Sequence, residues 1–453
     1  MPRKPIDMCS GPLLGNIIRY TIPIILTGLL QLLFNAADLV VVGQFCGSHS
    51  VGAVGATGSI INLIVNLFIG LSVGAGVTVA HHIGAGNEEE TGYTVHTAIP
   101  LAAVSGLLLT VVGLAVAPVL LRWMDTPDDL LTLSTLYVQV YFCGMIPSML
   151  YNYGAAILRA AGDSRSPLIF LTIAGAVNVV LNIIFVTVID MDVAGVALAT
   201  VLSQVLSAVL TLWVLARRTD ACRLEWRRMC IHARSLGRML RIGLPAGIQG
   251  SMFSISNVII QSTVNSFGAV VVSGASAAGN LEGFAYVAMN SFQQAAMNFT
   301  GQNVGALRYD RVRRIMRTCL VSVAVTGVVT GGLLYAFGQP LLGLYITDSQ
   351  EAIGYGMLRL AIIGLFYFIC GMMEVATGVI RGMGVSVAPM LVTVLGVCGF
   401  RLVWIWGVFP QLPSLECLYI SYPISWAITF LVEMVIYAVI IHHRRRPASG
   451  GNT

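Results

Sequence analysis

Long apolar runs alternate with short polar segments along the whole sequence. Each run can cross a lipid bilayer as a helix, because one crossing takes about 20 apolar residues. The pattern predicts twelve membrane-spanning helices, joined by loops too short to form a large soluble domain. The predicted spans are residues 15–43, 52–80, 95–121, 131–158, 166–189, 193–216, 237–267, 272–303, 315–339, 352–380, 387–409 and 417–441. We therefore predict an all-α integral membrane protein.

Composition excludes an ordinary soluble protein. Of the 453 residues, 57% are hydrophobic and 10% are charged, and the mean hydropathy is +0.84. A soluble domain carries about 25% charged residues, because water must solvate its surface. Most of this protein's surface is therefore expected to face lipid.

Basic residues gather on one predicted side of the membrane. Cytoplasmic loops retain Lys and Arg, and an even number of spans puts both termini on the same side. The basic segments are the N-terminus, 217–241, 308–317 and 444–446, whereas the opposite loops 44–51, 268–272 and 409–416 contain neither Lys nor Arg. We predict a multi-pass protein of the plasma (inner) membrane, with both termini cytoplasmic and no nucleic-acid partner.

The chain repeats itself after about 222 residues. At that offset LGNIIRYTIP (14–23) falls on LGRMLRIGLP (236–245), and ILRAAGDSRSP (157–167) falls on VIRGMGVSVAP (379–389). Two six-span halves then insert with the same orientation, as a parallel repeat, which is common in secondary transporters. The predicted domains are a cytoplasmic tail (1–14), an N-terminal six-helix bundle (15–216), a cytoplasmic linker (217–236), a C-terminal six-helix bundle (237–441) and a cytoplasmic tail (442–453).

Polar side chains inside the spans of the first half mark a candidate ion site. Asp38 lies in the first span, Asn178 and Asn182 lie one turn apart in the fifth, and Thr200 lies in the sixth. Their oxygens suit a hard cation, and a desolvated carboxyl suits a proton carrier. Alternatively, the Asn and Thr side chains only join helices. Pro23 removes a hydrogen bond inside the first span, which predicts either a hinge or a static kink.

The second half carries buried charges and many amides. Because a buried Arg needs a counter-ion, we predict that Arg401 forms a structural ion pair with Glu374 or Glu282. Aromatic and Met side chains beside amides can hold an apolar cation. The predicted substrate cavity comprises Gln31, Asn35, Gln249, Glu282, Tyr286, Met289, Asn290 and Gln293.

Several enzyme motifs are missing from the sequence. It contains no GxxxxGK[ST] loop for ATP, no GxSxG and no HExxH. His81 and His82 in HHIGAGNEEE are adjacent, so on a helix they point about 100° apart and do not form a metal site. We expect no enzyme activity, no metal and no cofactor.

The segments LFNAADLVVVG, ILRAAGDSRSPL and MDVAGVALATVLSQ, in this order, resemble the multidrug and toxic compound extrusion (MATE) family over residues 10–440. The resemblance implies two bundles forming a V, alternating access, and efflux of cationic drugs driven by inward Na⁺ or H⁺. It implies that Asp38 couples the ion together with Asn178 and Asn182. Asn182 matches the NorM-like branch better than the DinF-like branch.

The second half departs from the NorM-like pattern. Phe253 and Cys370 stand where that branch has a Glu and an Asp, and Glu374, one turn beyond Cys370, is expected to substitute in coupling. We predict a monomeric antiporter in the lipid bilayer that exchanges small organic molecules for a coupling cation. The alternatives are a flippase for a lipid-linked precursor, which would need a more basic cavity than Arg401 provides, and an intramembrane enzyme or receptor.

Overall fold

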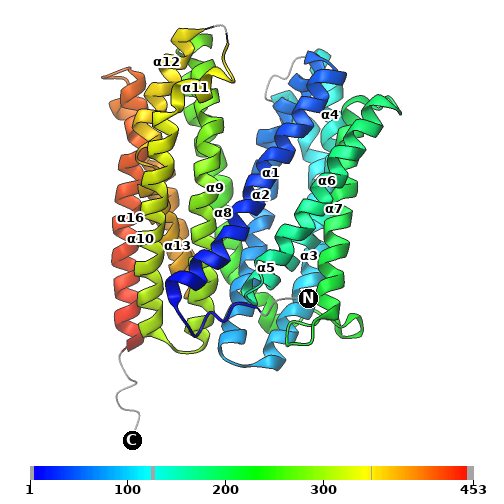
Figure 1. The fold of residues 1–453 in the computed structure, drawn as a ribbon, viewed down its shortest axis with the longest axis vertical. Helices are drawn as coiled ribbons and strands as arrows, with labels where there is room; N and C mark the ends of the chain where they lie inside the picture. Colours follow the sequence, from blue (N-terminus) through cyan, green and yellow to red (C-terminus); the bar gives the residue numbers. More distant parts are fainter. Residues whose placement is uncertain (1–4, 124–127, 348, 446–453) are drawn as a thin grey trace, which may run out of the picture. The chain divides into compact units, whose positions relative to one another are not determined.

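The computed structural model describes residues 5–123, 128–347 and 349–445, and within these ranges every regular element is a helix (Figure 1). The first half contains α1 (Leu13–Phe45), α2 (Ser48–Gly84), α3 (Glu88–Trp123), α4 (Asp128–Cys143), α5 (Met145–Ala160), α6 (Arg165–Thr187) and α7 (Asp192–Arg217). The second half contains η1 (Trp226–Arg228), α8 (Ala233–Asn265), α9 (Ala269–Gly305), α10 (Tyr309–Ala336), α11 (Gly338–Gly343), α12 (Gln350–Arg359), η2 (Leu360–Gly364), α13 (Tyr367–Gly382), α14 (Val387–Thr393), η3 (Val394–Gly399), α15 (Phe400–Val403), η4 (Trp404–Val408) and α16 (Leu415–Arg445).

The helices fall at the twelve predicted spans. In the described ranges, eight helices are long and apolar enough to cross a membrane, and two bent helix pairs raise this number to ten. The remaining two, α8 and α9, have 33 and 37 residues and are long enough to cross, but their many amides make them more polar. The predicted all-α membrane fold is confirmed.

Two predicted spans are bent, which the apolar pattern did not indicate. The span of α4 and α5 bends by 49° at Gly144. Pro147 has no N–H to donate to the carbonyl of Cys143, so the regular helix cannot continue through this point. The span of α12 and α13 bends by 42° after the π-helical segment η2, which is wider than an α-helix.

The two halves repeat in detail. Helices α1 and α8 both have 33 residues, and α2 and α9 both have 37. The glycines that precede α2 and α9, Gly47 and Gly268, have φ of 89° and 98°. Only glycine adopts this left-handed backbone freely, so both halves require the same residue at the same turn.

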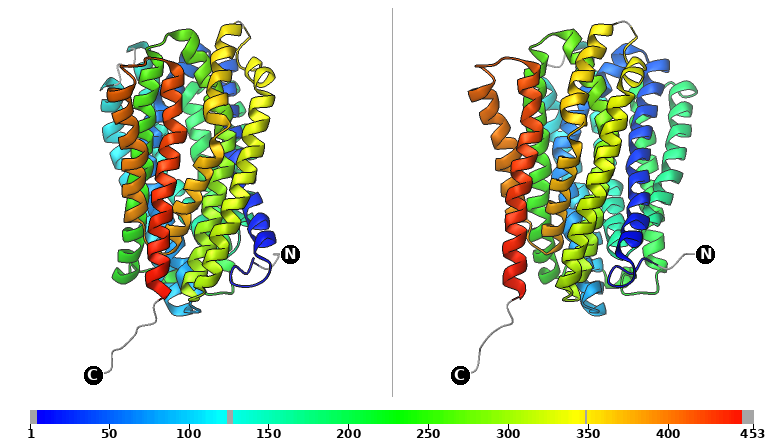
Figure 2. Two further views of the ribbon diagram at one scale, coloured as in Figure 1. Left: turned by 90° about the vertical axis from the view of Figure 1, so that its left-hand side faces the viewer. Right: turned by 60° about the vertical axis from the view of Figure 1, so that its left-hand side comes forward.

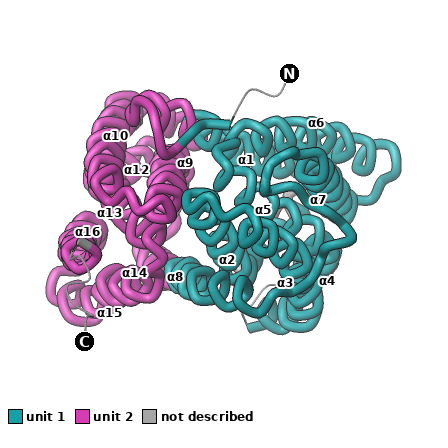
Figure 3. The backbone as a smooth tube through the Cα atoms, turned by 90° about the horizontal axis from the view of Figure 1, so that it is seen from below, with its two compact units in different colours: residues 1–7, 22–254 teal, residues 8–21, 255–453 magenta. Residues whose placement is uncertain are grey.

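Backbone contacts divide the chain into two compact units (Figure 3). Unit 1 comprises residues 1–7 and 22–254, and unit 2 comprises residues 8–21 and 255–453. Helix α1 is divided just before Pro23, and α8 is divided after Ser254. The predicted domains follow the internal repeat, whereas these two units follow the backbone contacts. The predicted domain limits therefore stay a prediction.

Each unit has its own helical core. In unit 1, α2, α3, α4, α5 and α7 surround a cluster of buried apolar side chains. In unit 2, α9 packs along α13, and α16 runs beside α13 and the π-helical segment η3 (Figure 2). The polar side chains described below lie within these two bundles.

The connector after α7 is docked on α3 in unit 1. His96 Nε2 accepts a hydrogen bond from the backbone N–H of Glu225 at 3.0 Å, and Thr97 Oγ1 accepts one from that of His232 at 3.1 Å. The ring of Tyr93 lies 4.3 Å from the ring of His232. The connector is therefore an ordered part of unit 1 rather than a free linker.

Glycines allow α2 and α8 to cross closely in unit 1. Gly70 and Gly74 of α2 face Gly243 and Gly247 of α8, and a Cβ built on Gly247 would lie 2.1 Å from the carbonyl oxygen of Leu67. Small residues at this spacing let membrane helices approach until their backbones touch. The GxxxG spacing on both helices explains why this crossing is so tight.

Gly247→Ala is expected to destabilise the protein by about 1–3 kcal/mol, because the new methyl group overlaps backbone atoms that cannot rotate away. Gly237→Ala on the same helix is the matched control, since nothing lies within 4 Å of its Cβ position. That change should be neutral or slightly stabilising. Thermal unfolding of the purified variants measures both, and equal midpoints would contradict the close crossing.

Candidate functional site

The Asp38 carboxylate lies at a hydrogen-bonded cluster inside unit 1. Asn182 Nδ2 donates to Asp38 Oδ1 at 2.5 Å and to Asn178 Oδ1 at 3.3 Å. Asn178 Nδ2 donates to Thr200 Oγ1 at 3.4 Å. The four residues predicted for coupling in the first half therefore form one chain of contacts across α1, α6 and α7.

A small residue on α6 positions α1 for these contacts. A Cβ on Gly175 would lie 1.8 Å from Cε2 of Phe34, so the Phe34 ring occupies the space that a side chain would take. Phe34 precedes Asp38 by one helical turn, and Gly175 precedes Asn178 and Asn182 by one and two turns. The close contact of ring and glycine thus holds the Asp38 carboxylate beside the Asn182 amide.

Two groups of this cluster, the amide oxygen of Asn182 and the carboxylate of Asp38, are suited to binding a cation. Asn182 is fully buried, and its Oδ1 accepts no hydrogen bond from the described residues. Asp38 is half-buried. The tyrosines Tyr137 and Tyr141 of α4 lie within electrostatic reach of Asp38. These two tyrosines were not predicted as site residues, although the sequence places them one helical turn apart in the predicted span 131–158.

The other residues predicted in the first half have mixed surroundings. Gln31 and Asn35 lie on the exposed side of α1, and Gln249 of α8 is buried in unit 1. Pro23 lies inside α1, and its carbonyl accepts a hydrogen bond from Thr27 Oγ1 at 2.7 Å. These positions leave their predicted roles as substrate contacts and hinge untested.

A second polar network crosses unit 2. Gln293 Nε2 donates to Glu374 Oε2 at 2.5 Å, and Asn290 Nδ2 donates to Gln293 Oε1 at 3.2 Å. Gln294 Nε2 donates to Asn290 Oδ1 at 2.8 Å. The amides of α9 thus lead to the Glu374 carboxylate on α13, which is the residue predicted to replace the missing acidic residue at Cys370.

The predicted ion pair between Arg401 and Glu282 is wrong, because Glu282 pairs with Arg359 instead. Arg359 Nε and Nη2 donate to Glu282 Oε1 and Oε2, both at 2.9 Å, in a two-point ion pair. In the described ranges no carboxylate lies within 4.0 Å of Arg401, so the predicted pairing with Glu374 is not formed either. Arg359 lies on α12, and the sequence does not show which face of this helix meets Glu282 of α9.

Two further residues of the predicted cavity differ in exposure. The side chain of Met289 is fully buried in unit 2, and a Cβ on Gly371 would lie 2.4 Å from its Sδ atom. Met289 therefore packs α9 against α13, and its predicted cavity role stays a prediction. Tyr286, one turn earlier, is 42% exposed.

A third buried acid, Glu433 of α16, was not among the residues predicted from the sequence. Its side chain is fully buried, and Oε1 accepts hydrogen bonds from Thr377 Oγ1 at 2.6 Å and from Thr393 Oγ1 at 3.4 Å. Glu433 interacts electrostatically with Glu374 and Arg381. The signal was present, because a lone Glu in the middle of the last apolar run is as unusual as Asp38 in the first.

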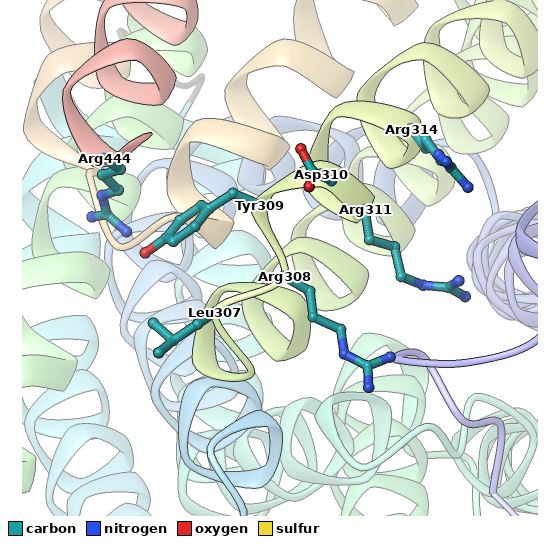
Figure 4. A pocket seen from close by; sticks show the side chains of 7 residues that line it. All are labelled: Leu307, Arg308, Tyr309, Asp310, Arg311, Arg314 and Arg444. Carbon is teal, nitrogen blue, oxygen red and sulfur yellow. The ribbon is translucent and has the colours of Figure 1, made fainter. Parts of the chain in front are cut away.

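A basic cavity of about 610 Å³ lies at one end of unit 2 (Figure 4). Arg308 and Arg311 donate hydrogen bonds to backbone carbonyls of the segment 8–11. Four arginines line this cavity: Arg308, Arg311, Arg314 and Arg444. It is separate from the acidic and amide side chains above, and none of its residues was predicted to contact substrate. In the described ranges, no three His, Cys, Asp or Glu side chains are grouped to hold a metal ion.

A model of the family described as MatE matches the chain twice, at residues 23–184 and at residues 245–406. The chain belongs to the MatE family. The two matches begin 222 residues apart, at Pro23 and Pro245, which is the offset of the internal repeat. The predicted family membership is confirmed. Because the members of this family are transporters, the protein is a MatE transporter and not an enzyme.

Relatives of this MatE transporter are similar over most of their length. It is 27% identical to the probable multidrug resistance protein YpnP of Bacillus subtilis, over 88% of each chain. It is 25% identical to the probable multidrug resistance protein NorM of Thermotoga maritima, over 85% of this chain and 84% of the relative. Whether the chain is closer to the NorM-like or the DinF-like branch stays a prediction.

Solved structures share the fold of this MatE transporter. A MOP superfamily transporter from Pyrococcus furiosus matches with a TM-score of 0.91 at 21% identity, covering 99% of this chain and all of that chain. An outward-facing multidrug resistance MATE family transporter matches equally well, with a TM-score of 0.91. At this identity the likeness supports the fold alone.

Proposed function

We propose that this MatE transporter is a secondary antiporter that exports amphipathic, cationic small molecules in exchange for H⁺ or Na⁺. The observation that carries the proposal is the Asp38 carboxylate, held by Asn182 and grouped with Asn178 and Thr200. A carboxylate in a membrane helix is costly unless it faces a partner or an ion path. Asp38 is therefore the expected binding group for the coupling cation, and no other cofactor is needed.

Ion and substrate are expected to bind in turn. Helix α1 carries Asp38 in unit 1, but its residues before Ile22 belong to unit 2. Pro23 lies at this division and lacks the N–H that would complete the helix there. When a bound cation or proton neutralises Asp38, its carboxylate accepts the hydrogen bond from Asn182 less strongly, and α1 can bend at Pro23. Alternating access needs only that the ion and the substrate each prefer one of the two states.

Unit 2 is the expected contact for the organic substrate. Tyr286 is exposed and interacts with Asn290, which donates to Gln293, and Gln293 donates to the Glu374 carboxylate. An aromatic face and a nearby carboxylate favour a cation with an apolar body. The names of the relatives from B. subtilis and T. maritima, which refer to multidrug resistance, favour the same class of substrate.

The basic end of unit 2 supports a cytoplasmic location for the termini. Arg308 and Arg311 contact the N-terminal segment 8–11, and Arg444 lies in the same cavity near the end of α16. Basic residues at one end of a bundle favour the cytoplasmic side. We place the transporter in the plasma (inner) membrane with both termini inside, and propose that it acts as a monomer.

The test is efflux of a fluorescent cationic dye from proteoliposomes. A pH gradient and a Na⁺ gradient are imposed in separate experiments, and protein-free liposomes give the background. One of the two gradients is expected to drive dye movement well above that background. If neither gradient moves the dye, the antiport proposal is wrong, and the flippase alternative becomes the next function to test.

A further inference from the structure

Arg401 is a buried cation with an unusual environment in unit 2. It lies on α15, between the π-helical segments η3 and η4, and is 2% exposed. Its guanidinium carbon lies 3.9 Å from the ring centroid of Tyr422 and 5.8 Å from that of Trp426. Nε donates to Ser425 Oγ at 3.2 Å. Three residues of α16 therefore surround the charged group.

These contacts leave the positive charge without a negative partner. Of the two candidates predicted from the sequence, Glu282 is bound by Arg359, and Glu374 accepts a hydrogen bond from Gln293. Aromatic faces attract a guanidinium but do not neutralise it. Burying an unpaired charge costs far more than burying a paired one. An anion from outside the chain would supply the missing partner of this buried charge.

Arg359 shows what the same group does when an anion is present. Its Nε and Nη2 form one edge of the guanidinium and bind both oxygens of the Glu282 carboxylate. On Arg401 that edge contacts only the Ser425 hydroxyl through Nε, and Nη2 has no hydrogen-bond partner among the described residues. Arg359 thus has a carboxylate on this edge of its guanidinium, and Arg401 does not.

We propose that Arg401 is a binding site for the carboxylate group of an organic ligand. Nη2 donates to a carboxylate oxygen, while Ser425 holds the guanidinium through Nε and Tyr422 covers one of its faces. The rings of Tyr367 and Trp426, whose centroids are 5.4 Å apart, add an apolar wall nearby. These aromatic neighbours favour a monocarboxylate with a flat apolar body. This site does not depend on the proposed coupling role of Asp38.

The test uses the full-length protein in detergent, with benzoate as the probe and chloride at the same ionic strength as the comparison. A ligand that binds the folded state raises the unfolding temperature in a saturable way. We expect a saturable rise with benzoate and a smaller, non-saturating change with chloride. Tryptophan fluorescence should saturate over the same range, and Trp426→Phe should remove that signal.

Three variants assign the effect to Arg401. Arg401→Gln should abolish saturation, and it should fold because it removes a charge that has no partner. Arg401→Lys keeps the charge but loses the planar fork, so the affinity for benzoate should fall at least tenfold. Arg444→Gln, in the basic cavity, is the matched control and should bind like the wild type. Equal responses of wild type and Arg401→Gln, no saturation in the wild type, or equal saturation with chloride would each overturn the proposal.

Discussion

Replacing Asp38 by Asn is expected to reduce ion-driven dye export to the background of protein-free liposomes. The amide has the same shape as the carboxylate, but it can neither carry a proton nor balance a bound Na⁺. Its oxygen can still accept a hydrogen bond from Asn182, so the folding cost should be about 1 kcal/mol. Dye efflux under each gradient and thermal unfolding of the same preparation measure the two effects separately.

Asp190→Asn provides the matched control for this change. Asp190 is an exposed carboxylate in the turn between α6 and α7 of the same unit, with a φ of 60°. Asn is one of the few residues that tolerate this left-handed conformation, so the control should fold and transport like the wild type. Wild-type export by Asp38→Asn would show that the coupling ion binds elsewhere, with Glu374 the next residue to replace.

Local features of the sequence predicted the fold well. A span is recorded in the chain as a continuous apolar run, so its position needs no knowledge of other helices. The repeat is recorded in the same way, because Pro23 and Pro245 stand in the same place in two matching halves. The bends at Gly144 and after η2 were missed, since an apolar run does not show where a helix stops being straight.

The candidate site was predictable only in part. The residues Asp38, Asn178, Asn182 and Thr200 were chosen as rare polar groups in apolar runs, and the structure brings them together. The partner of a buried charge is a different question, because it depends on which faces of two helices meet. Segment η2 begins directly after Arg359 and shifts the register of that helix. No sequence period could therefore assign Glu282 to Arg359 rather than to Arg401.

Arg359→Met is expected to destabilise the protein by about 3–5 kcal/mol, because it leaves the Glu282 carboxylate buried without its partner. The pair is nearly enclosed, with side-chain exposures of 12% for Arg359 and 5% for Glu282. A loss of this size should lower the thermal midpoint strongly and reduce the yield of folded protein. Thermal unfolding in detergent, with size-exclusion chromatography as a check on folding, measures it.

Two companion variants separate charge pairing from packing. Removing both charges, in Glu282→Met with Arg359→Met, should recover most of the lost stability, since apolar side chains of similar size can replace a buried ion pair at little cost. Arg401→Met removes a more deeply buried guanidinium that has no carboxylate within 4.0 Å in the described ranges, so it should cost much less than Arg359→Met. Equal losses in the two single Met variants would mean that packing of the long side chain, and not its partner, determines stability in unit 2. The double variant tests the same point independently. If packing determines stability, the second Met should add to the loss, and if charge pairing determines it, the second Met should reduce the loss.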